Sequence, residues 1–193
     1  DIWRTDAYYG SRFHPGSSEK YDTAPKEWLS DNCFEHGPTT VKLKAIRAKK
    51  KIKYEGLDYV IPYQVGQLDS SNYFMQTHGY FEIRSKMPSS HGMWPAFWLA
   101  SIMSWPPEID IYEIYTGRKN GVKTITNNVH WGTENKKKAN ANSFKAFDLS
   151  SKYFIYGCEW SDETIKFYFQ DELIRVMKTP VDFIHPMHII INT

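Results

Sequence analysis

Three acidic residues lie close together in the segment Glu108-Ile109-Asp110-Ile111-Tyr112-Glu113. Successive side chains of a β-strand point to opposite faces, so Glu108 and Asp110 share one face while the isoleucines between them face a core. In a regular strand Glu113 would point into that core, where an unpaired carboxylate is costly. We therefore predict a β-bulge near Tyr112, which returns Glu113 to the face of the other two acids.

A row of three carboxylates suits retaining glycoside hydrolysis. That reaction needs two carboxyl groups about 5–5.5 Å apart, one ionised as nucleophile and one protonated as general acid. A third carboxylate between them would hydrogen-bond the nucleophile and raise its neighbour's pKa by like-charge repulsion. We therefore expect the carboxyls of Glu108 and Glu113 to lie about 5–6 Å apart. An acidic strand on a solvated sheet face, or a calcium site with oxygen ligands, would place the same residue types together, and the acids alone leave these alternatives open.

The elements that must position these acids are short strands. Period-two alternation and apolar runs predict strands near residues 41–46, 64–71, 79–87, 109–114, 125–131, 153–160, 164–170, 173–178 and 188–192. We interpret the first 38 residues, which lack a sustained period, as one or two extended strands with long loops. Turn residues separate the strands, and no stretch of twelve residues keeps a helical apolar stripe. The pattern predicts one all-β domain over residues 1–193, built as an antiparallel sandwich or barrel.

Composition narrows the classes of function. The net charge of +2 lacks the electrostatic footprint of a nucleic-acid-binding protein. Two lysine runs, at residues 49–51 and 136–138, are expected to be solvated loops or hairpin tips. The aromatic share of 16% favours a ligand with flat faces, although a β-rich core also prefers aromatic residues. The sequence contains no run of 18 apolar residues that could span a membrane. Cys33 and Cys158 are expected to be separate thiols.

The segments around the acids narrow the interpretation further. Residues 91–99 read His-Gly-Met-Trp-Pro-Ala-Phe-Trp-Leu, Trp105-Pro106-Pro107 leads into the acids, and Asn128-Val129-His130-Trp131 follows them. Together with the Glu-x-Asp-x-x-Glu motif, this arrangement resembles glycoside hydrolase family 16, the laminarinases, lichenases, agarases and carrageenases. The resemblance covers roughly residues 39–192. It implies a two-sheet antiparallel jelly roll, concanavalin-like, with a concave substrate cleft, and endo-acting, retaining hydrolysis of a polysaccharide's internal β-glycosidic bonds.

The resemblance also implies a role for each acid. Glu108 would be the nucleophile, Glu113 the general acid/base and Asp110 the assisting carboxylate. The residues expected to bind substrate are Trp105, His130, Trp98, Arg84 and Asn128. Trp105 would stack on a sugar next to the scissile bond. Each substrate-binding assignment competes with a structural role, such as core packing for a Trp or a cross-strand ion pair for Arg84.

The substrate is the least determined part of this interpretation. Plain β-1,3- or mixed-linkage β-glucan is the first choice. Basic segments at residues 118–119 and 136–138 keep algal galactan (agarose, porphyran or carrageenan) as the alternative, because sulfate groups attract Arg and Lys. A non-catalytic carbohydrate-binding protein is disfavoured since all three acids are present, and a transglycosylase is disfavoured by the bulged motif. No cofactor is required, and a structural calcium ion would be compatible with the fold.

The chain opens with Asp1-Ile2-Trp3, without an initiator Met or a signal peptide. We expect a processed protein that is secreted, periplasmic or held at the cell surface, and that acts as a monomer on a polysaccharide, with no nucleic-acid partner and no membrane span. Members of the family continue past the strand at residues 188–192. The domain is therefore expected to lack its C-terminal closing strands, because a sandwich that stopped there would have an open edge.

Overall fold

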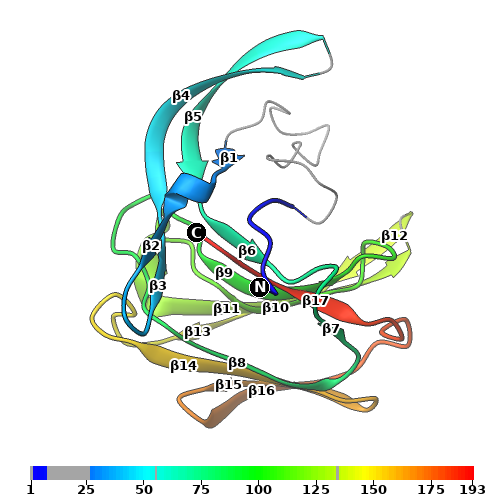
Figure 1. Ribbon diagram of the computed structural model, residues 1–193. Coiled ribbons are helices and arrows are strands. Elements are labelled where there is room, and N and C mark those ends of the chain that lie inside the picture. Colours follow the sequence, from blue (N-terminus) through cyan, green and yellow to red (C-terminus); the bar gives the residue numbers. More distant parts are fainter. Residues whose placement is uncertain (1, 8–26, 55, 134) are drawn as a thin grey trace.

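The computed structural model describes residues 2–7, 27–54, 56–133 and 135–193. Within these ranges the chain is built almost entirely from β-strands, with short 3-10 turns η1 (Asp31–Cys33) and η2 (Gly121–Lys123). Figure 1 shows two sheets packed in layers and a long hairpin that rises away from them. The predicted all-β sandwich is confirmed. Residues 8–26, part of the predicted extended N-terminal segment, lie outside the described residues.

The larger sheet, called the first sheet here, carries the acidic segment. Its strands are β6 (Gln67–Asp69), β7 (Met75–Gln76), β9 (Ala96–Ser101), β10 (Glu108–Glu113), β11 (Thr124–Thr133), β12 (Lys136–Ala139), β13 (Asn142–Lys145) and β17 (Met187–Asn192). They are hydrogen-bonded in the order β12-β11-β10-β9-β17-β6, with β13 pairing with β11 and β7 with β17. Every pairing in this sheet is antiparallel, so β10 lies between two antiparallel neighbours, β9 and β11.

The second sheet has four strands. They are β8 (Gly79–Ser85), β14 (Phe154–Trp160), β15 (Thr164–Phe169) and β16 (Glu172–Lys178), in the order β16-β15-β14-β8. The predicted hairpin turn between β15 and β16 is present. Its residues Gln170 and Asp171 both have positive φ angles, of 52° and 65°. Such left-handed conformations are typical of tight hairpin turns.

A long hairpin forms the third part of the fold, and it differs from the prediction. β4 (Ala45–Tyr54) and β5 (Leu57–Val65) pair along their length, β1 (Glu27–Leu29) lies parallel to β5, and β2 (Phe34–His36) pairs with β3 (Val41–Leu43). In Figure 1 this hairpin arches on the side of the first sheet that faces away from the second. The predicted strand at 64–71 is divided between β5 and β6 at Gly66, where a Cβ would lie 2.7 Å from the Cys33 carbonyl oxygen.

The two lysine runs are solvated, but they are not loops. Residues 49–51 lie within β4 and residues 136–138 within β12, and all six side chains are exposed. Both strands belong to hairpins that project into solvent, so a strand there can carry cations on both of its faces. The prediction that these runs form loops or hairpin tips is therefore wrong, and only the expected exposure is correct.

The core lies between the two sheets. Ile109 and Ile111 of β10 are 0% and 2% exposed, and on the facing sheet Tyr156 and Trp160 are each 1% exposed. These residues belong to one apolar cluster with alternating residues of β9, β11 and β15. Cys33 and Cys158 are buried and unpaired, which confirms the prediction of separate thiols. Within the described ranges, no helix has the length and apolar character needed to cross a membrane.

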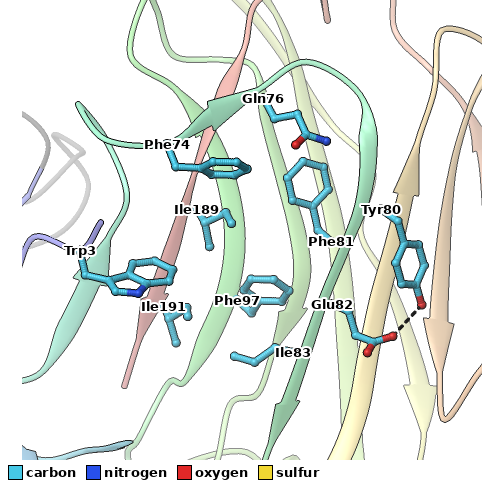
Figure 2. Close-up of a pocket in the computed structure, with 10 residues that line it drawn as sticks. All are labelled: Trp3, Phe74, Gln76, Tyr80, Phe81, Glu82, Ile83, Phe97, Ile189 and Ile191. Carbon is cyan, nitrogen blue, oxygen red and sulfur yellow. Dashed lines mark hydrogen bonds between the residues drawn. The ribbon is translucent and has the colours of Figure 1, made fainter. Parts of the chain in front are cut away.

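A cavity of about 380 Å³ opens between the sheets beside β8 (Figure 2). Its walls come mainly from β7, β8, β9 and β17, and they are mostly apolar. The lining residues are Trp3, Phe74, Gln76, Tyr80, Phe81, Glu82, Ile83, Phe97, Ile189 and Ile191. None of the three acids of β10 is among them, so this cavity is separate from the candidate site.

Candidate active site

The predicted bulge in β10 is present. Against β11, Asp110 pairs with Asn128 and the next pair is Glu113 with Thr126, so two residues of β10 oppose one residue of β11. Against β9, the register shifts between Asp110 and Tyr112. The shift buries the Tyr112 side chain in the core, where it is 2% exposed. As predicted, Glu113 returns to the face that carries Glu108 and Asp110.

The register of the first sheet places each acid in a row of cross-strand neighbours. Glu108 lies between Ala100 and His130. Asp110 lies between Trp98 and Asn128. Residues paired across antiparallel strands point to the same face. The sheet therefore brings four of the predicted residues, Asp110, Trp98, Asn128 and His130, to the face that carries Glu108.

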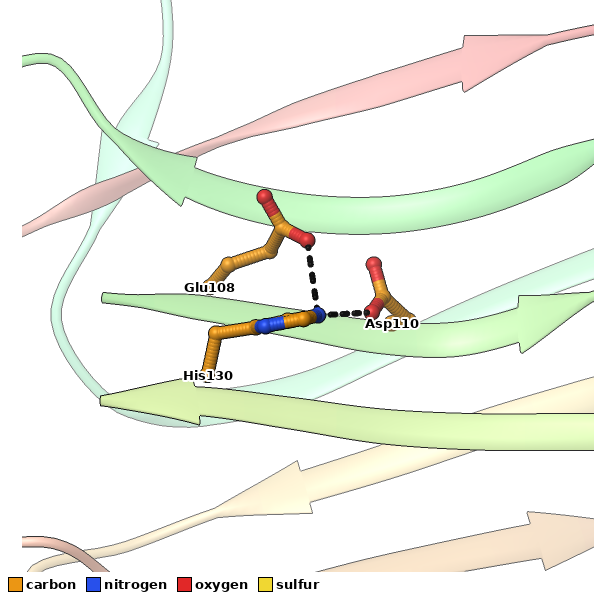
Figure 3. A group of neighbouring side chains, drawn as sticks. All are labelled: Glu108, Asp110 and His130. Carbon is orange, nitrogen blue, oxygen red and sulfur yellow. Dashed lines mark ion pairs between the residues drawn. The ribbon is translucent and has the colours of Figure 1, made fainter. Parts of the chain in front are cut away.

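Glu108 is surrounded by aromatic and imidazole groups. The Trp105 indole N–H donates to Glu108 Oε2 at 2.7 Å. The Nε2 atom of His130 lies 3.4 Å from Glu108 Oε1 and 3.4 Å from Asp110 Oδ2. Figure 3 shows the imidazole pointing toward both carboxyls. The Trp105 and His130 ring centroids are 5.8 Å apart, and Lys137 Nζ lies 4.4 Å from the Trp105 ring centroid. Trp105 and His130 are thus placed beside the acids, as predicted.

Glu113 has a separate set of donors. Its Oε1 atom accepts hydrogen bonds from the Trp94 indole N–H at 3.0 Å and from the Tyr115 hydroxyl at 2.9 Å. The Trp94 and Tyr115 rings lie 4.8 Å apart, and the Arg118 guanidinium lies 3.9 Å from the Tyr115 ring centroid. Neither Trp94 nor Tyr115 was among the predicted site residues. The spacing of two between Glu113 and Tyr115 was the available signal, since it places both side chains on one strand face.

Two more predicted residues complete this face. The Trp98 indole N–H donates to Asn192 Oδ1 at 2.8 Å, and Asn192 Nδ2 donates to the Trp94 carbonyl oxygen at 3.4 Å. Asn128 Nδ2 lies 2.7 Å from His130 Nε2, within hydrogen-bond distance. Asn128 and Trp98 therefore hold neighbouring groups of the site in place as well as lining it.

Arg84 is the predicted site residue that the structure does not bring to this group. It lies on β8 at the edge of the second sheet, and its guanidinium is 4.7 Å from the Tyr153 ring centroid. Phe81 and Ile83 pack toward the core from the same strand, so alternation turns Arg84 to the outer face of the sandwich. The prediction that Arg84 lines the site with the acids is therefore corrected.

Burial raises the pKa of all three carboxyl groups. The pKa of Glu108 rises to about 8, because burial disfavours its charge and Asp110 repels it, while His130 and the Trp105 N–H oppose the rise. The pKa of Asp110 is raised by burial and by the charge of Glu113. Burial also raises the pKa of Glu113, and the Tyr115 and Trp94 hydrogen bonds oppose that rise. Because the three groups interact, they ionise one after another, so protonated and ionised carboxyls can coexist near neutral pH.

Glu108, Asp110 and His130 also form a group whose spacing could hold a metal ion. One ligand atom from each lies within 4.8 Å of the others (Figure 3). The set mixes imidazole nitrogen with carboxylate oxygen, whereas calcium prefers oxygen ligands alone. The group therefore does not match the structural calcium site that the sequence leaves room for.

Comparison with known proteins gives a consistent set of similarities. The model of the family described as glycosyl hydrolases family 16 matches residues 24–192. Endo-1,3-1,4-beta-glycanase ExsH of Rhizobium meliloti (strain 1021) is 36% identical over 166 residues, which are 84% of this chain and 34% of that protein. Endo-1,3-1,4-beta-glycanase EglC of the same organism is 34% identical over 164 residues, with the same coverage of 84% and 34%. The chain thus spans about a third of the length of these two relatives.

The sandwich also resembles solved structures. LamAcat from Zobellia galactanivorans superposes with a TM-score of 0.74 and 23% identity, covering 94% of this chain and 78% of that one. At this level of identity the likeness concerns the fold. It agrees with the two-sheet architecture described above.

Proposed function

Because the chain belongs to glycosyl hydrolases family 16, we propose that it is an endo-acting, retaining glycoside hydrolase that cleaves internal bonds of a β-1,3- or mixed-linkage β-glucan. The observation that carries the proposal is the bulge in β10. It places Glu113 on the same face as Glu108 and Asp110, and each glutamate has its own indole N–H donor. Two carboxyls on one face, with different surroundings, are what glycoside hydrolysis requires, and retention needs them about 5–5.5 Å apart.

In the proposed mechanism the two glutamates have different roles. Glu113 protonates the oxygen of the leaving sugar while Glu108 attacks the anomeric carbon, which gives a covalent glycosyl-enzyme and breaks the glycosidic bond. Glu113, now ionised, then removes a proton from a water molecule that attacks the same carbon and releases Glu108. Both donors to Glu113 use Oε1. The other oxygen, Oε2, is therefore the atom that delivers the proton.

The residues around Glu108 stabilise it as it reacts. The Trp105 N–H lowers the pKa of Glu108, and so does the positive charge of His130 when the imidazole is protonated. Both effects favour the ionised form that attacks the sugar. Trp105 is 42% exposed, which leaves ring surface for a sugar to stack on. Asp110, between the two glutamates along the strand, opposes these effects, because its charge raises the pKa of Glu108.

Two of the relatives given above support the proposed substrate. Both bear the name endo-1,3-1,4-beta-glycanase, which favours a β-1,3- or mixed-linkage glucan for this chain. One contact favours the alternative of a sulfated algal galactan. Lys137 lies over the ring of Trp105, beside the nucleophile, where its ammonium group could meet a sulfate on the bound sugar. In either case we propose that the chain acts as a monomer outside the cytoplasm, where such polysaccharides occur.

A product assay tests this function. The wild-type protein should release oligosaccharides from laminarin or mixed-linkage glucan faster than from agarose, porphyran or carrageenan. Proton NMR of the first products should show the β-anomer, because two displacements retain configuration. The matched control is Glu108→Gln, which should lower kcat by at least about 10³-fold because the nucleophile is lost. Inverted products, or a fully active Glu108→Gln variant, would contradict the mechanism.

A further inference from the structure

An asparagine occupies a core position in the strand next to the acids. On β11, Asn127 alternates with Ile125 and Val129, which are 1% and 0% exposed in the core between the sheets. Asn127 is itself 1% exposed. A buried amide among aliphatic side chains is unfavourable unless it makes a hydrogen bond. The position of Asn127 therefore needs a reason, and the bulge in β10 provides one.

The Asn127 side chain binds the backbone of the bulge. Its Nδ2 atom donates to the Ile111 carbonyl oxygen at 2.5 Å. Ile111 lies where β10 loses its register, since neither β11 nor β9 places a residue opposite it in the described pairings. A bulge disrupts the ladder of backbone hydrogen bonds at the extra residue. The amide of Asn127 thus gives the bulge carbonyl a partner inside the core.

The backbone of Asn127 is held from the second sheet. Arg175 of β16 donates from Nη1 to the Asn127 carbonyl oxygen at 3.1 Å and from Nη2 to the Asn140 carbonyl oxygen at 2.8 Å. The Arg175 side chain is 9% exposed and lies over the Phe167 ring at 5.2 Å. A buried guanidinium that donates two hydrogen bonds is held rigidly in place. Asn127 therefore presents its amide to Ile111 from a fixed point.

We propose that Asn127 is a positioning residue for Glu113, a role that rests on the proposed function of Glu113 as the general acid. Asn127 touches no substrate. It stabilises the one-residue shift that turns Tyr112 into the core and Glu113 out of it. Without this hydrogen bond the carbonyl of Ile111 has lost its partner in an apolar environment, and the bulge relaxes. The first consequence is a change in the direction of the Glu113 carboxyl.

The test compares two substrates that differ in their need for an acid. The sugar released from a glucan is a poor leaving group and needs a proton from Glu113. The phenolate released from a 2,4-dinitrophenyl glycoside of the same oligosaccharide leaves without one. In Asn127→Leu, which keeps the size but loses the amide, kcat/KM on the glucan should fall about 10- to 100-fold. On the aryl glycoside it should fall less than about threefold. The ratio of the two values does not depend on the fraction of folded enzyme.

Two further variants complete the experiment. Ile125→Val, a core change on the same face of β11, is the matched control and should leave the ratio unchanged. If Asn127→Leu does not fold, Asn127→Ser replaces it, because the serine hydroxyl is too short to reach the Ile111 oxygen and the same change in ratio is expected. Equal losses on both substrates, or no loss on either, would overturn the positioning role.

The proposed function fails in a different way from the positioning role. If Glu113 is not the acid, Glu113→Gln will lose no more activity on the glucan than on the aryl glycoside. If the chain is not a glycoside hydrolase, the wild-type protein will cleave neither substrate. Both results are independent of Asn127, so the two proposals can be separated in one set of measurements.

Discussion

Single side chains set the proton affinity of the two proposed catalytic carboxyls. Both are buried, and burial alone would raise the pKa of each. The His130 imidazole acts on both, but the other neighbours differ: a charged carboxyl and an indole act on Glu108, whereas a phenol, another indole and a guanidinium act on Glu113. Because these other neighbours come from different residues, mutating them can change the two pKa values separately. The pH dependence of activity is therefore the most direct measure of the site.

Asp110→Asn should move the acid limb of the pH profile. The charge of Asp110 raises the pKa of Glu108, so its removal lowers that pKa. Glu108 must be ionised to attack, and activity therefore rises as the pH rises through its pKa. In Asp110→Asn the acid limb of kcat/KM should lie about one pH unit lower than in the wild type. A limb that moves to higher pH would show that Asp110 does not act through its charge.

Tyr115→Phe should move the other limb. The Tyr115 hydroxyl donates to Glu113 and lowers its pKa, so the phenylalanine variant has a higher Glu113 pKa. Glu113 must be protonated to act as acid, and activity falls as the pH rises through its pKa. The alkaline limb of kcat/KM should therefore move to higher pH by about half a unit to one unit. Ser85→Ala is a suitable control, because it removes a hydroxyl that donates to the buried Tyr112 on the other side of the sheet.

The residues of the site were predictable where they lie on the acidic strand itself or are paired with it on a neighbouring strand. The alternation of the acidic segment placed Glu108 and Asp110 together and required a bulge for Glu113. Arg84 was placed wrongly because a strand's own sequence shows which of its residues share a face, but not which sheet the strand joins. Trp94 approaches Glu113 from outside β9, where no period indicates which way a side chain points.

At the scale of elements, a buried cation adds hydrogen bonds between the two sheets to the apolar core that they share. Arg175 on β16 reaches across the sandwich to the carbonyl oxygens of Asn127 and Asn140. Burial lowers the pKa of Arg175. Its hydrogen bonds to the two carbonyl oxygens offset part of the cost of removing the charge from water. In the sequence it stands between Ile174 and Val176 in a strand, where an arginine is normally expected on the solvated face. Its partners lie 35 and 48 residues away, so no local pattern could identify them.

Arg175→Met should destabilise the sandwich. The methionine keeps much of the apolar stem but removes the donor to the buried Asn127 carbonyl oxygen, whereas the Asn140 oxygen retains the Val129 N–H. An unsatisfied buried acceptor costs about 1–3 kcal/mol, so we expect the free energy of unfolding to fall by about 1–3 kcal/mol in urea denaturation. Lys178→Met, an exposed change on the same strand, should alter it by less than about 0.5 kcal/mol. An Arg175→Met variant as stable as the wild type would show that the guanidinium does not link the sheets.

At the scale of the whole molecule, the sandwich was more predictable than the hairpins that project from it into solvent. Alternating apolar residues predicted most of the strands that face each other across the core, although not β9, because burial imposes a period of two on both sheets. The hairpin of β4 and β5 leaves the sandwich, so its side chains are mostly solvated and carry little of that period. The lysines of β4 and β12 were read as loops for the same reason. Exposure removes the signal on which the assignment of a strand depends.

The buried carboxyls should also make the fold less stable as the pH rises. The pKa of Glu108 is about 8 in the folded protein against an ordinary value of 4.5, so its contribution to stability is complete below about pH 4.5. Between these values the unfolded chain releases the proton while the folded protein retains it, and stability is lost until the pH passes about 8. A site that holds its acids out of water therefore lowers the stability of the whole molecule at neutral pH.

Glu108→Gln removes this loss, because glutamine has no proton to release. The variant should be more stable than the wild type at pH 8 by about 1–3 kcal/mol, since each unit of pKa difference corresponds to about 1.4 kcal/mol and the neighbouring acids share the effect. At pH 4.5 the two proteins should differ by less than about 0.5 kcal/mol, because both then carry an uncharged side chain in the folded state. Urea denaturation at the two pH values measures the difference directly. A Glu108→Gln variant that is less stable at pH 8, or whose advantage does not grow with pH, would show that Glu108 is ionised at little cost and that its pKa is not raised by burial.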